Sequence, residues 1–237
     1  MIAWAGRVGR ALSGWRPGVY LFISVVCLYG ASMSRETAWG DARPIYSVAD
    51  SMLRGDGVAV NVRWPSDAPP GRNGKFYAAQ PWLPSLVHVP GAAIHGGLWY
   101  LHLRPELEHL SVVFACHLAG ALLGGLVAWL FFRLCRRHGA RPGVAGFAAI
   151  LLATGTMVWV YARYPFSEIT QIACFTGFFL ALSRLLERLD WRTALGAGLW
   201  AGLLFNTKYI YALSLGGALL IVLLEHRKAL LPLAKAL

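Results

Sequence analysis

The sequence predicts an all-α polytopic membrane protein with about six transmembrane helices and surface helices in a long first outer loop. Of its 237 residues, 57% are hydrophobic and only 14% are charged, and the mean hydropathy is +0.52. A typical soluble domain carries about 25% charged residues. Apolar runs of roughly 20 residues, the length that crosses a hydrocarbon core, recur along the chain.

The net charge of +11 fits this class because the basic residues gather beside the apolar runs. Short connections rich in Arg and Lys stay in the cytoplasm, so we expect the amino terminus inside and the first loop outside. The membrane accounts for these charges, which argues against a nucleic-acid partner. The basic groups are Arg7, Arg10 and Arg16; Arg133, Arg136, Arg137 and Arg141; Arg184, Arg188 and Arg192; and Arg227 with Lys228.

The first span is predicted over residues 17–33, and residues 34–108 form the outer loop. No small-residue cleavage pattern follows the apolar run, so it is interpreted as a retained anchor. The loop contains no cysteine, and no two cysteines elsewhere have metal-ligand spacing. Neither a disulfide framework nor a zinc site is therefore expected.

An amphipathic helix is predicted over residues 43–54 of this loop, lying along the outer membrane surface with its apolar face down. Pro44 suits its first turn and Gly55 its exit. The apolar residues that repeat at helical spacing are Ile45, Val48, Ala49, Met52 and Leu53. Residues 56–74 are rich in Pro, Gly, Asn and Asp, which predicts an irregular segment.

A second, short surface helix is predicted within residues 82–100, where Pro84 and Pro90 interrupt the apolar run. The following spans are predicted over residues 110–132, 144–160 and 169–186. Gly120 and Gly124 have the small-xxx-small spacing that allows close helix contact. His117, inside the second span, is expected to hydrogen-bond a neighbouring helix.

The last apolar region, residues 194–224, is longer than one span requires and has basic flanks at both ends. Flanks of this kind place both ends inside. We therefore predict a hairpin of two short helices, 194–207 and 209–225, with Lys208 at the outer turn. One long tilted helix is the alternative.

Four motifs occur in order at the outer ends of these segments. They are Gly40-Asp41-Ala42-Arg43-Pro44-Ile45-Tyr46; Gly74-Lys75-Phe76-Tyr77 with Pro81, Leu83, Pro84 and Pro90; Tyr161-Ala162-Arg163 with Ser167-Glu168; and Gly198, Gly202 and Thr207-Lys208. Together they resemble the membrane-embedded GT-C glycosyltransferases, which take a sugar from a polyprenyl-phosphate carrier. That group includes the lipid A aminoarabinose transferase and the protein mannosyltransferases. The resemblance covers the amino-terminal half of a typical member, and a carboxy-terminal half is expected to be lacking.

The resemblance implies a catalytic acid at Asp41, ahead of the predicted surface helix. A carboxylate there is favoured by the helix dipole and can accept a proton from an acceptor hydroxyl. The family usually has a second acid at the next position, where this chain has Ala42, so a mechanism with two adjacent carboxylates is in doubt. The simpler interpretation is that Asp41 is only a capping or approach residue of the predicted helix.

Lys208 is a candidate functional residue, because an ammonium inside an apolar stretch is costly unless it has a function, and the resemblance implies that it binds the donor phosphate. The alternative is that it snorkels to the interface. Arg163 is a candidate for binding the phosphate, and Glu168 is a candidate for orienting the acceptor. The alternative is that the two form a structural ion pair with each other. Further phosphate or sugar ligands are Lys75, Arg43, Tyr46 and Tyr77, although interfacial aromatics usually serve as membrane anchors.

The function that these residues predict is transfer of a sugar to an outer-face acceptor in a bacterial inner membrane. No cofactor is expected besides the lipid-linked sugar substrate, since the sequence lacks an Asp-x-Asp motif, while a divalent metal stays open. The alternatives are a non-catalytic or truncated module that needs a partner subunit for the missing spans, and a small transporter.

Overall fold

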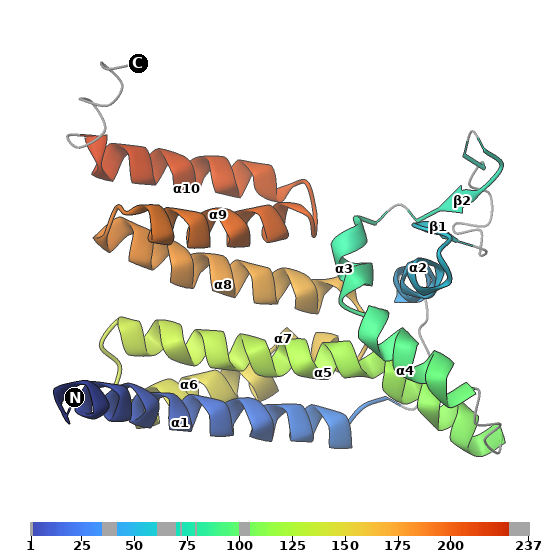
Figure 1. Cartoon of the computed structure of the whole chain (residues 1–237), viewed down its shortest axis with the longest axis horizontal. Helices are drawn as coiled ribbons and strands as arrows, with labels where there is room; N and C mark the ends of the chain where they lie inside the picture. Colours follow the sequence, from blue (N-terminus) through green and yellow to red (C-terminus); the bar gives the residue numbers. More distant parts are fainter. Residues whose placement is uncertain are drawn as a thin grey trace.

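The computed structural model describes residues 2–34, 42–60, 70–71, 73–78, 80–99 and 105–227. Long helices lie side by side as a bundle: α1 (Ile2–Ala31), α5 (Pro105–Arg137), α8 (Ser167–Glu187), α9 (Trp191–Phe205) and α10 (Tyr211–Glu225) (Figure 1). Helix α6 (Pro142–Gly155) packs against α1 and α5. We call the two ends of this bundle the α2 end and the basic end.

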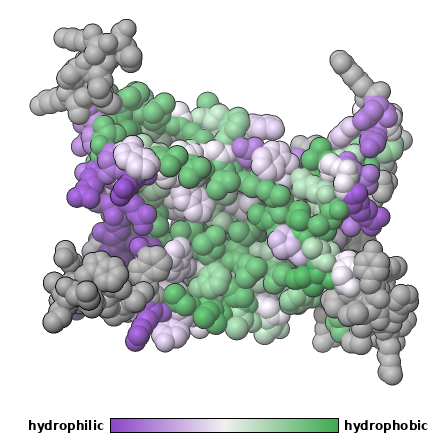
Figure 2. All heavy atoms as spheres, in the orientation of Figure 1, coloured by the Kyte–Doolittle hydropathy of each residue, from purple (hydrophilic) through white to green (hydrophobic). Residues whose placement is uncertain are grey.

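The α2 end carries the segments that follow α1 in the chain (Figure 1). They are α2 (Ala42–Arg54), β1 (Ala59–Val60), β2 (Phe76–Tyr77), α3 (Trp82–Leu86) and α4 (Val89–Trp99). The basic end is where α5 and α8 end, near Arg137 and Arg184. Hydrophilic atoms gather there, whereas the middle of the visible face is hydrophobic (Figure 2).

Two of the described helices are long and apolar enough to cross a membrane, namely α5 from Leu110 onward and α8. Shorter apolar helices cover Arg16–Ala31, Pro142–Gly155 and Tyr211–Glu225. This architecture fits the predicted all-α membrane class. Six complete spans, however, are not shown.

The predicted third span, 144–160, is broken at Thr156 into α6 and α7 (Met157–Ala162). Thr156 has an extended backbone, with φ −131° and ψ −179°, and therefore cannot continue the helix. Its hydroxyl oxygen accepts a hydrogen bond from the Val158 backbone N–H at 3.2 Å and so caps α7.

The apolar region 194–224 forms α9 and α10, joined by a turn at residues 206–210. The side chains of Asn206 and Thr207 donate hydrogen bonds to the carbonyls of Gly202 and Leu204, at 2.8 and 2.6 Å. The same two carbonyls also accept the backbone N–H groups of Asn206 and Thr207, at 3.1 and 3.0 Å, which closes the last turn of α9. The polar pair thus ends α9 and leaves Lys208 in the turn.

Two features of the outer loop differ from the sequence prediction. The segment expected to be irregular contributes to a short antiparallel pair, with Ala59 opposite Tyr77 and Val60 opposite Phe76. The proline-rich segment forms α3 and α4 rather than one surface helix, because Pro81 precedes α3 and Pro90 lies in the first turn of α4. Proline is tolerated at those positions, where a helix needs no N–H donor.

Helix α2 is amphipathic, as its sequence pattern indicates, but its apolar face is covered by protein. Ile45, Val48 and Ala49 are buried, and α2 packs on α3 and α4. The expected position with this face against the membrane surface is therefore wrong. Leu53 at its carboxyl end is 43% exposed, and Gly55 ends the helix with φ 81°.

Helix α5 is the centre of the bundle, since it contacts α1, α4, α6, α7 and α8. Small residues set how closely its neighbours approach. A Cβ added to Gly120 would lie 2.6 Å from the Ala162 carbonyl oxygen at the end of α7, and one added to Gly124 would lie 2.3 Å from the Tyr29 ring. Tyr29 of α1 is fully buried, and its hydroxyl donates to the Ala153 carbonyl of α6 at 2.7 Å.

Replacing Gly120 with alanine is expected to lower the free energy of unfolding by about 1–3 kcal/mol, because the new methyl group would collide with backbone rather than with a movable side chain. The matched control is Gly146→Ala in α6, where an added Cβ meets nothing within 4 Å. That change should leave stability unchanged or raise it by up to about 1 kcal/mol. Thermal unfolding in detergent measures both, and equal midpoints for the two variants would contradict the close approach of α5 and α7.

Candidate active site

Two of the residues predicted for the site form an ion pair at the α2 end. Lys208 in the α9–α10 turn lies with its Nζ 3.6 Å from Oε1 of Glu168, in the first turn of α8. The helix dipole favours an acid at that position. Their side chains are 49% and 33% exposed, so both charges are open to solvent or to a ligand. Exposed ion pairs contribute only about 0–1 kcal/mol, and a stronger anion can therefore displace the carboxylate from Lys208.

A chain of hydrogen bonds leads from α10 to Glu168. The Tyr211 hydroxyl donates to Oε1 of Gln171 at 2.9 Å, and the Gln171 amide nitrogen donates to Oγ of Ser167 at 3.0 Å. Ser167 in turn donates to Oε2 of Glu168 at 3.4 Å. This network fixes α10 to the start of α8 and holds Glu168 in place.

Sequence reasoning missed Gln171 and Tyr211. The available signal was an amide side chain within a predicted span, four residues after Ser167 and thus on the same helix face. Buried polar groups require partners, so Gln171 had to meet another polar side chain.

Arg163 follows α7 and is held against the end of α1. Its Nε donates a hydrogen bond to the Ser32 carbonyl, and its guanidinium lies 5.2 Å from the centre of the Trp159 ring. Among the residues that the structure describes, no ion pair joins Arg163 to Glu168. The structural link between them that was considered from sequence is therefore replaced by the pair of Glu168 with Lys208.

Asp41 lies outside the described residues, directly before the start of α2 at Ala42. Arg43 is exposed on α2, with its backbone carbonyl accepting the Ser47 hydroxyl at 2.9 Å. The Tyr46 hydroxyl is buried and has no hydrogen-bond partner in the described part of the chain. Burial raises the pKa of Tyr46, so this hydroxyl keeps its proton.

Lys75 and Tyr77 belong to the strand hairpin, which projects from the α2 end (Figure 1). Lys75 and Asp56 line a cavity of about 290 Å³ beside β1 and β2. The Tyr77 hydroxyl accepts a hydrogen bond from the Asn73 amide at 2.7 Å, and its side chain is 44% exposed. Among the described residues, no hydrogen bond or ion pair joins Lys75 or Tyr77 to Glu168 or Lys208.

Two histidines near each other, His88 and His117, are buried, and His117 also lies near Arg163. His117 Nδ1 donates to the Val113 carbonyl of its own helix at 2.7 Å, so the expected bond to a neighbouring helix is wrong. His88, between α3 and α4, is 1% exposed, and its Nδ1 has no partner among the described residues. Burial, with the nearby His117, lowers the pKa of His88 from 6.5 to about 4.

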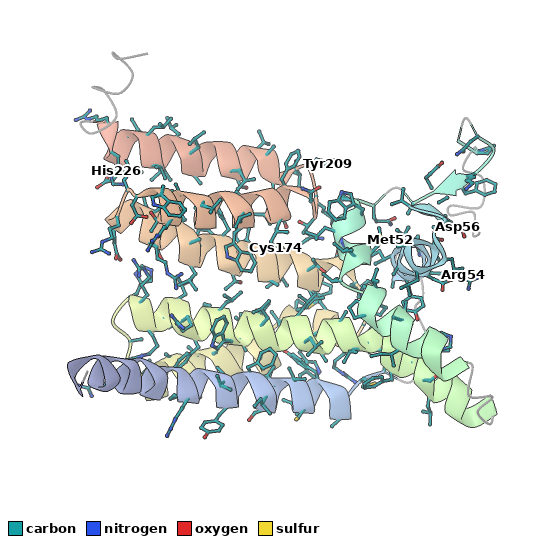
Figure 3. All side chains as sticks on the ribbon, viewed as in Figure 1. Met52, Arg54, Asp56, Cys174, Tyr209 and His226 are labelled. Carbon is teal, nitrogen blue, oxygen red and sulfur yellow. The ribbon has the colours of Figure 1, made fainter. Side chains whose placement is uncertain are left out.

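The candidate residues converge on the α2 end from segments that are distant in sequence. Figure 3 shows Tyr209 of the α9–α10 turn at the same end of the bundle as Met52 and Arg54 of α2. The start of α8 and helix α3 lie at this end of the bundle as well (Figure 1). Acidic, basic and aromatic side chains thus surround the end of an apolar bundle.

Residues 96–236 match the model of a protein family described as dolichyl-phosphate-mannose-protein mannosyltransferase. The chain belongs to this mannosyltransferase family. The match includes Arg163, Glu168 and Lys208, whereas Asp41, Lys75 and the α2 residues precede it. Searches of curated proteins and of solved structures found no match.

Membership in the mannosyltransferase family confirms the GT-C resemblance drawn from the sequence motifs. It supports a membrane glycosyltransferase of the GT-C type, with a membrane location that agrees with the apolar helices α5 and α8. A lipid-linked sugar donor is consistent with this family.

The buried state of His88 predicts that acid weakens the fold at the α2 end. Between pH 6.5 and about 4 the unfolded chain binds a proton that folded His88 does not, so the free energy of unfolding falls as pH decreases through this window. The full difference corresponds to roughly 3 kcal/mol. Thermal unfolding at neutral pH and near pH 5 should show a drop in midpoint that is reduced in His88→Gln.

The control for this effect is His138→Gln, because His138 is exposed at the basic end. It should keep the pH dependence of the wild-type protein. If His88→Gln retained the full drop in midpoint on acidification, His88 would not be the group that resists protonation.

Proposed function

We propose that this protein transfers a sugar from a polyprenyl-phosphate carrier to an acceptor hydroxyl at the α2 end of the bundle. The observation that carries the proposal is the exposed pair of Lys208 and Glu168, which lies within the family match and beside the outer-loop helices. The α2 end faces the outside of a bacterial inner membrane in this proposal, with the amino terminus in the cytoplasm. The arginines at the opposite end support that orientation.

Lys208 is the proposed ligand of the donor phosphate. The bond between the sugar C1 and the phosphate oxygen breaks in the transfer, and negative charge accumulates on the departing polyprenyl phosphate. An ammonium fixed in a turn stabilises that charge, and it can exchange Glu168 for phosphate because the pair is exposed and 3.6 Å apart. Arg163, Arg43 and Lys75 are proposed as further phosphate ligands.

Asp41 is the proposed general base, and Glu168 the group that orients the acceptor. The acceptor hydroxyl forms the new bond to C1 and gives its proton to the Asp41 carboxylate. Glu168, held by Ser167, supplies a second carboxylate from α8, because α2 begins with Ala42 where the family usually has an acid. Tyr46 and Tyr77 are proposed to contact the sugar.

No resident metal or other cofactor is part of this proposal. The lipid bilayer holds the donor beside the bundle, so the carrier enters from the side. The identity of the sugar, whether hexose or pentose, is left to the assay.

A transfer assay in membranes separates the proposed roles of Asp41 and Lys208. Asp41→Asn should lower kcat by about a hundredfold or more, because general-base catalysis contributes 10²–10⁴-fold. Lys208→Met should lower kcat and should also raise the KM for the polyprenyl-phosphate sugar, because it removes a ligand of the phosphate. The assay is run both with and without EDTA, because the sequence leaves a divalent metal open.

Asp50→Asn is the matched control for Asp41→Asn, because Asp50 lies on α2 in an exposed pair with Arg54 at 2.8 Å. It should retain wild-type transfer at equal protein levels. Unchanged transfer by Asp41→Asn would remove Asp41 from the mechanism. Unchanged kinetics in Lys208→Met would remove the phosphate site.

A further inference from the structure

The basic end contains a cleft between α5 and α8 that the proposed transfer reaction does not use. Its volume is about 320 Å³. The residues that line it are Arg133, Arg136 and Arg137 of α5 with Leu180, Arg184 and Glu187 of α8. Four arginines against one glutamate give the lining a net charge of three positive units.

The one acidic residue in this lining, Glu187, is already counted in that net charge. Arg137 binds the Ser183 carbonyl at 3.3 Å and forms the ion pair with Glu187, but its Nε is buried without a hydrogen-bond partner in the described part of the chain. Arg136 donates to the neutral carbonyl of Ala140 at 2.7 Å. Arg133 and Arg184, from facing helices, repel each other.

We propose that this cleft binds the phosphate headgroup of an anionic membrane lipid. A phosphate offers several acceptor oxygens, and guanidinium groups bind it in paired hydrogen bonds. One phosphate placed between the helices would lie among Arg133, Arg136 and Arg184 and would offset the repulsion of Arg133 and Arg184.

The position of the cleft favours a lipid as the source of the phosphate. Helices α5 and α8 are the two described helices long enough to span a membrane, and the cleft lies where both of them end. Leu180 supplies an apolar wall one turn before Arg184, and the Trp129 ring lies 5.6 Å below the Arg133 guanidinium. Basic pockets between transmembrane helices bind anionic headgroups in this way. The bound lipid would join α5 to α8 at the end opposite the proposed transfer site.

Native mass spectrometry of the full chain in detergent tests the site. The protein is titrated with phosphatidylglycerol and, separately, with phosphatidylcholine, whose headgroup has no net charge. We expect phosphatidylglycerol to bind and phosphatidylcholine to bind far more weakly. The double variant Arg136→Gln/Arg184→Gln should bind phosphatidylglycerol roughly tenfold to thirtyfold more weakly.

The control is Arg141→Gln/Arg192→Gln, which removes the same charge from exposed positions outside the cleft lining. It should bind like the wild-type protein. Glu187→Gln keeps every arginine and removes the acid that competes with phosphate, so it should bind more tightly and also serves if the double variant does not fold.

Equal affinity in the double variant, or an equal loss in the control, would overturn the cleft as the binding site. Weaker binding by Glu187→Gln would also count against it. Displacement of the lipid by inorganic phosphate at equal concentration would overturn the lipid assignment in favour of a soluble anion. None of these outcomes depends on sugar transfer, so this proposal and the proposed function can fail separately.

Discussion

The close packing of α5 against α1 and α7 is the contact on which the rest of the structure depends. Gly120 and Gly124 have no side chains to hold the neighbours away, so the Ala162 carbonyl and the Tyr29 ring approach the α5 backbone directly. This contact fixes the end of α7, and therefore the position of Arg163 in the turn that follows. Arg163 then reaches back to the Ser32 carbonyl at the end of α1. A steric constraint inside the bundle thus sets the geometry of the α2 end.

The two ends of the bundle differ in the kind of charge that they present. At the α2 end, Lys208 and Glu168 have opposite charges and remain exposed, which suits a site where a phosphate arrives and departs. At the basic end, arginines from α5 and α8 face one cleft with one acid in its lining, which suits a bound anion that stays. The same apolar helices join both ends, so a membrane would place them on opposite surfaces.

Local patterns in the sequence predicted several features that depend on neighbouring residues. The spacing of Ile45, Val48 and Ala49 indicated α2, and Gly55 at its exit has the positive φ that few other residues tolerate. The basic flanks of residues 194–224 indicated a turn near Lys208. The ordered outer motifs indicated the GT-C family, which the family match confirms.

Features that depend on distant residues could not be predicted in this way. Arg163 is the cation nearest to Glu168 in sequence. Glu168 forms its ion pair with Lys208 instead, because the α9–α10 turn packs beside the start of α8. The bond between Gln171 and Tyr211 crosses 40 residues and needs the same packing. The burial of the α2 apolar face depends on packing against α3 and α4, which the spacing of apolar residues within α2 does not reveal. Asp41 lies outside the described residues, so its role rests on the resemblance.

The central claim is that the donor phosphate binds at the α2 end, beside Lys208. Photocrosslinking with a polyprenyl phosphate that carries a photoreactive group next to its phosphate tests it most directly, when the labelled peptides of the full chain are mapped in membranes. The account predicts label on the α9–α10 turn and the start of α8, reduced in Lys208→Met. Label confined to the basic end, or unchanged label on the turn in Lys208→Met, would contradict it.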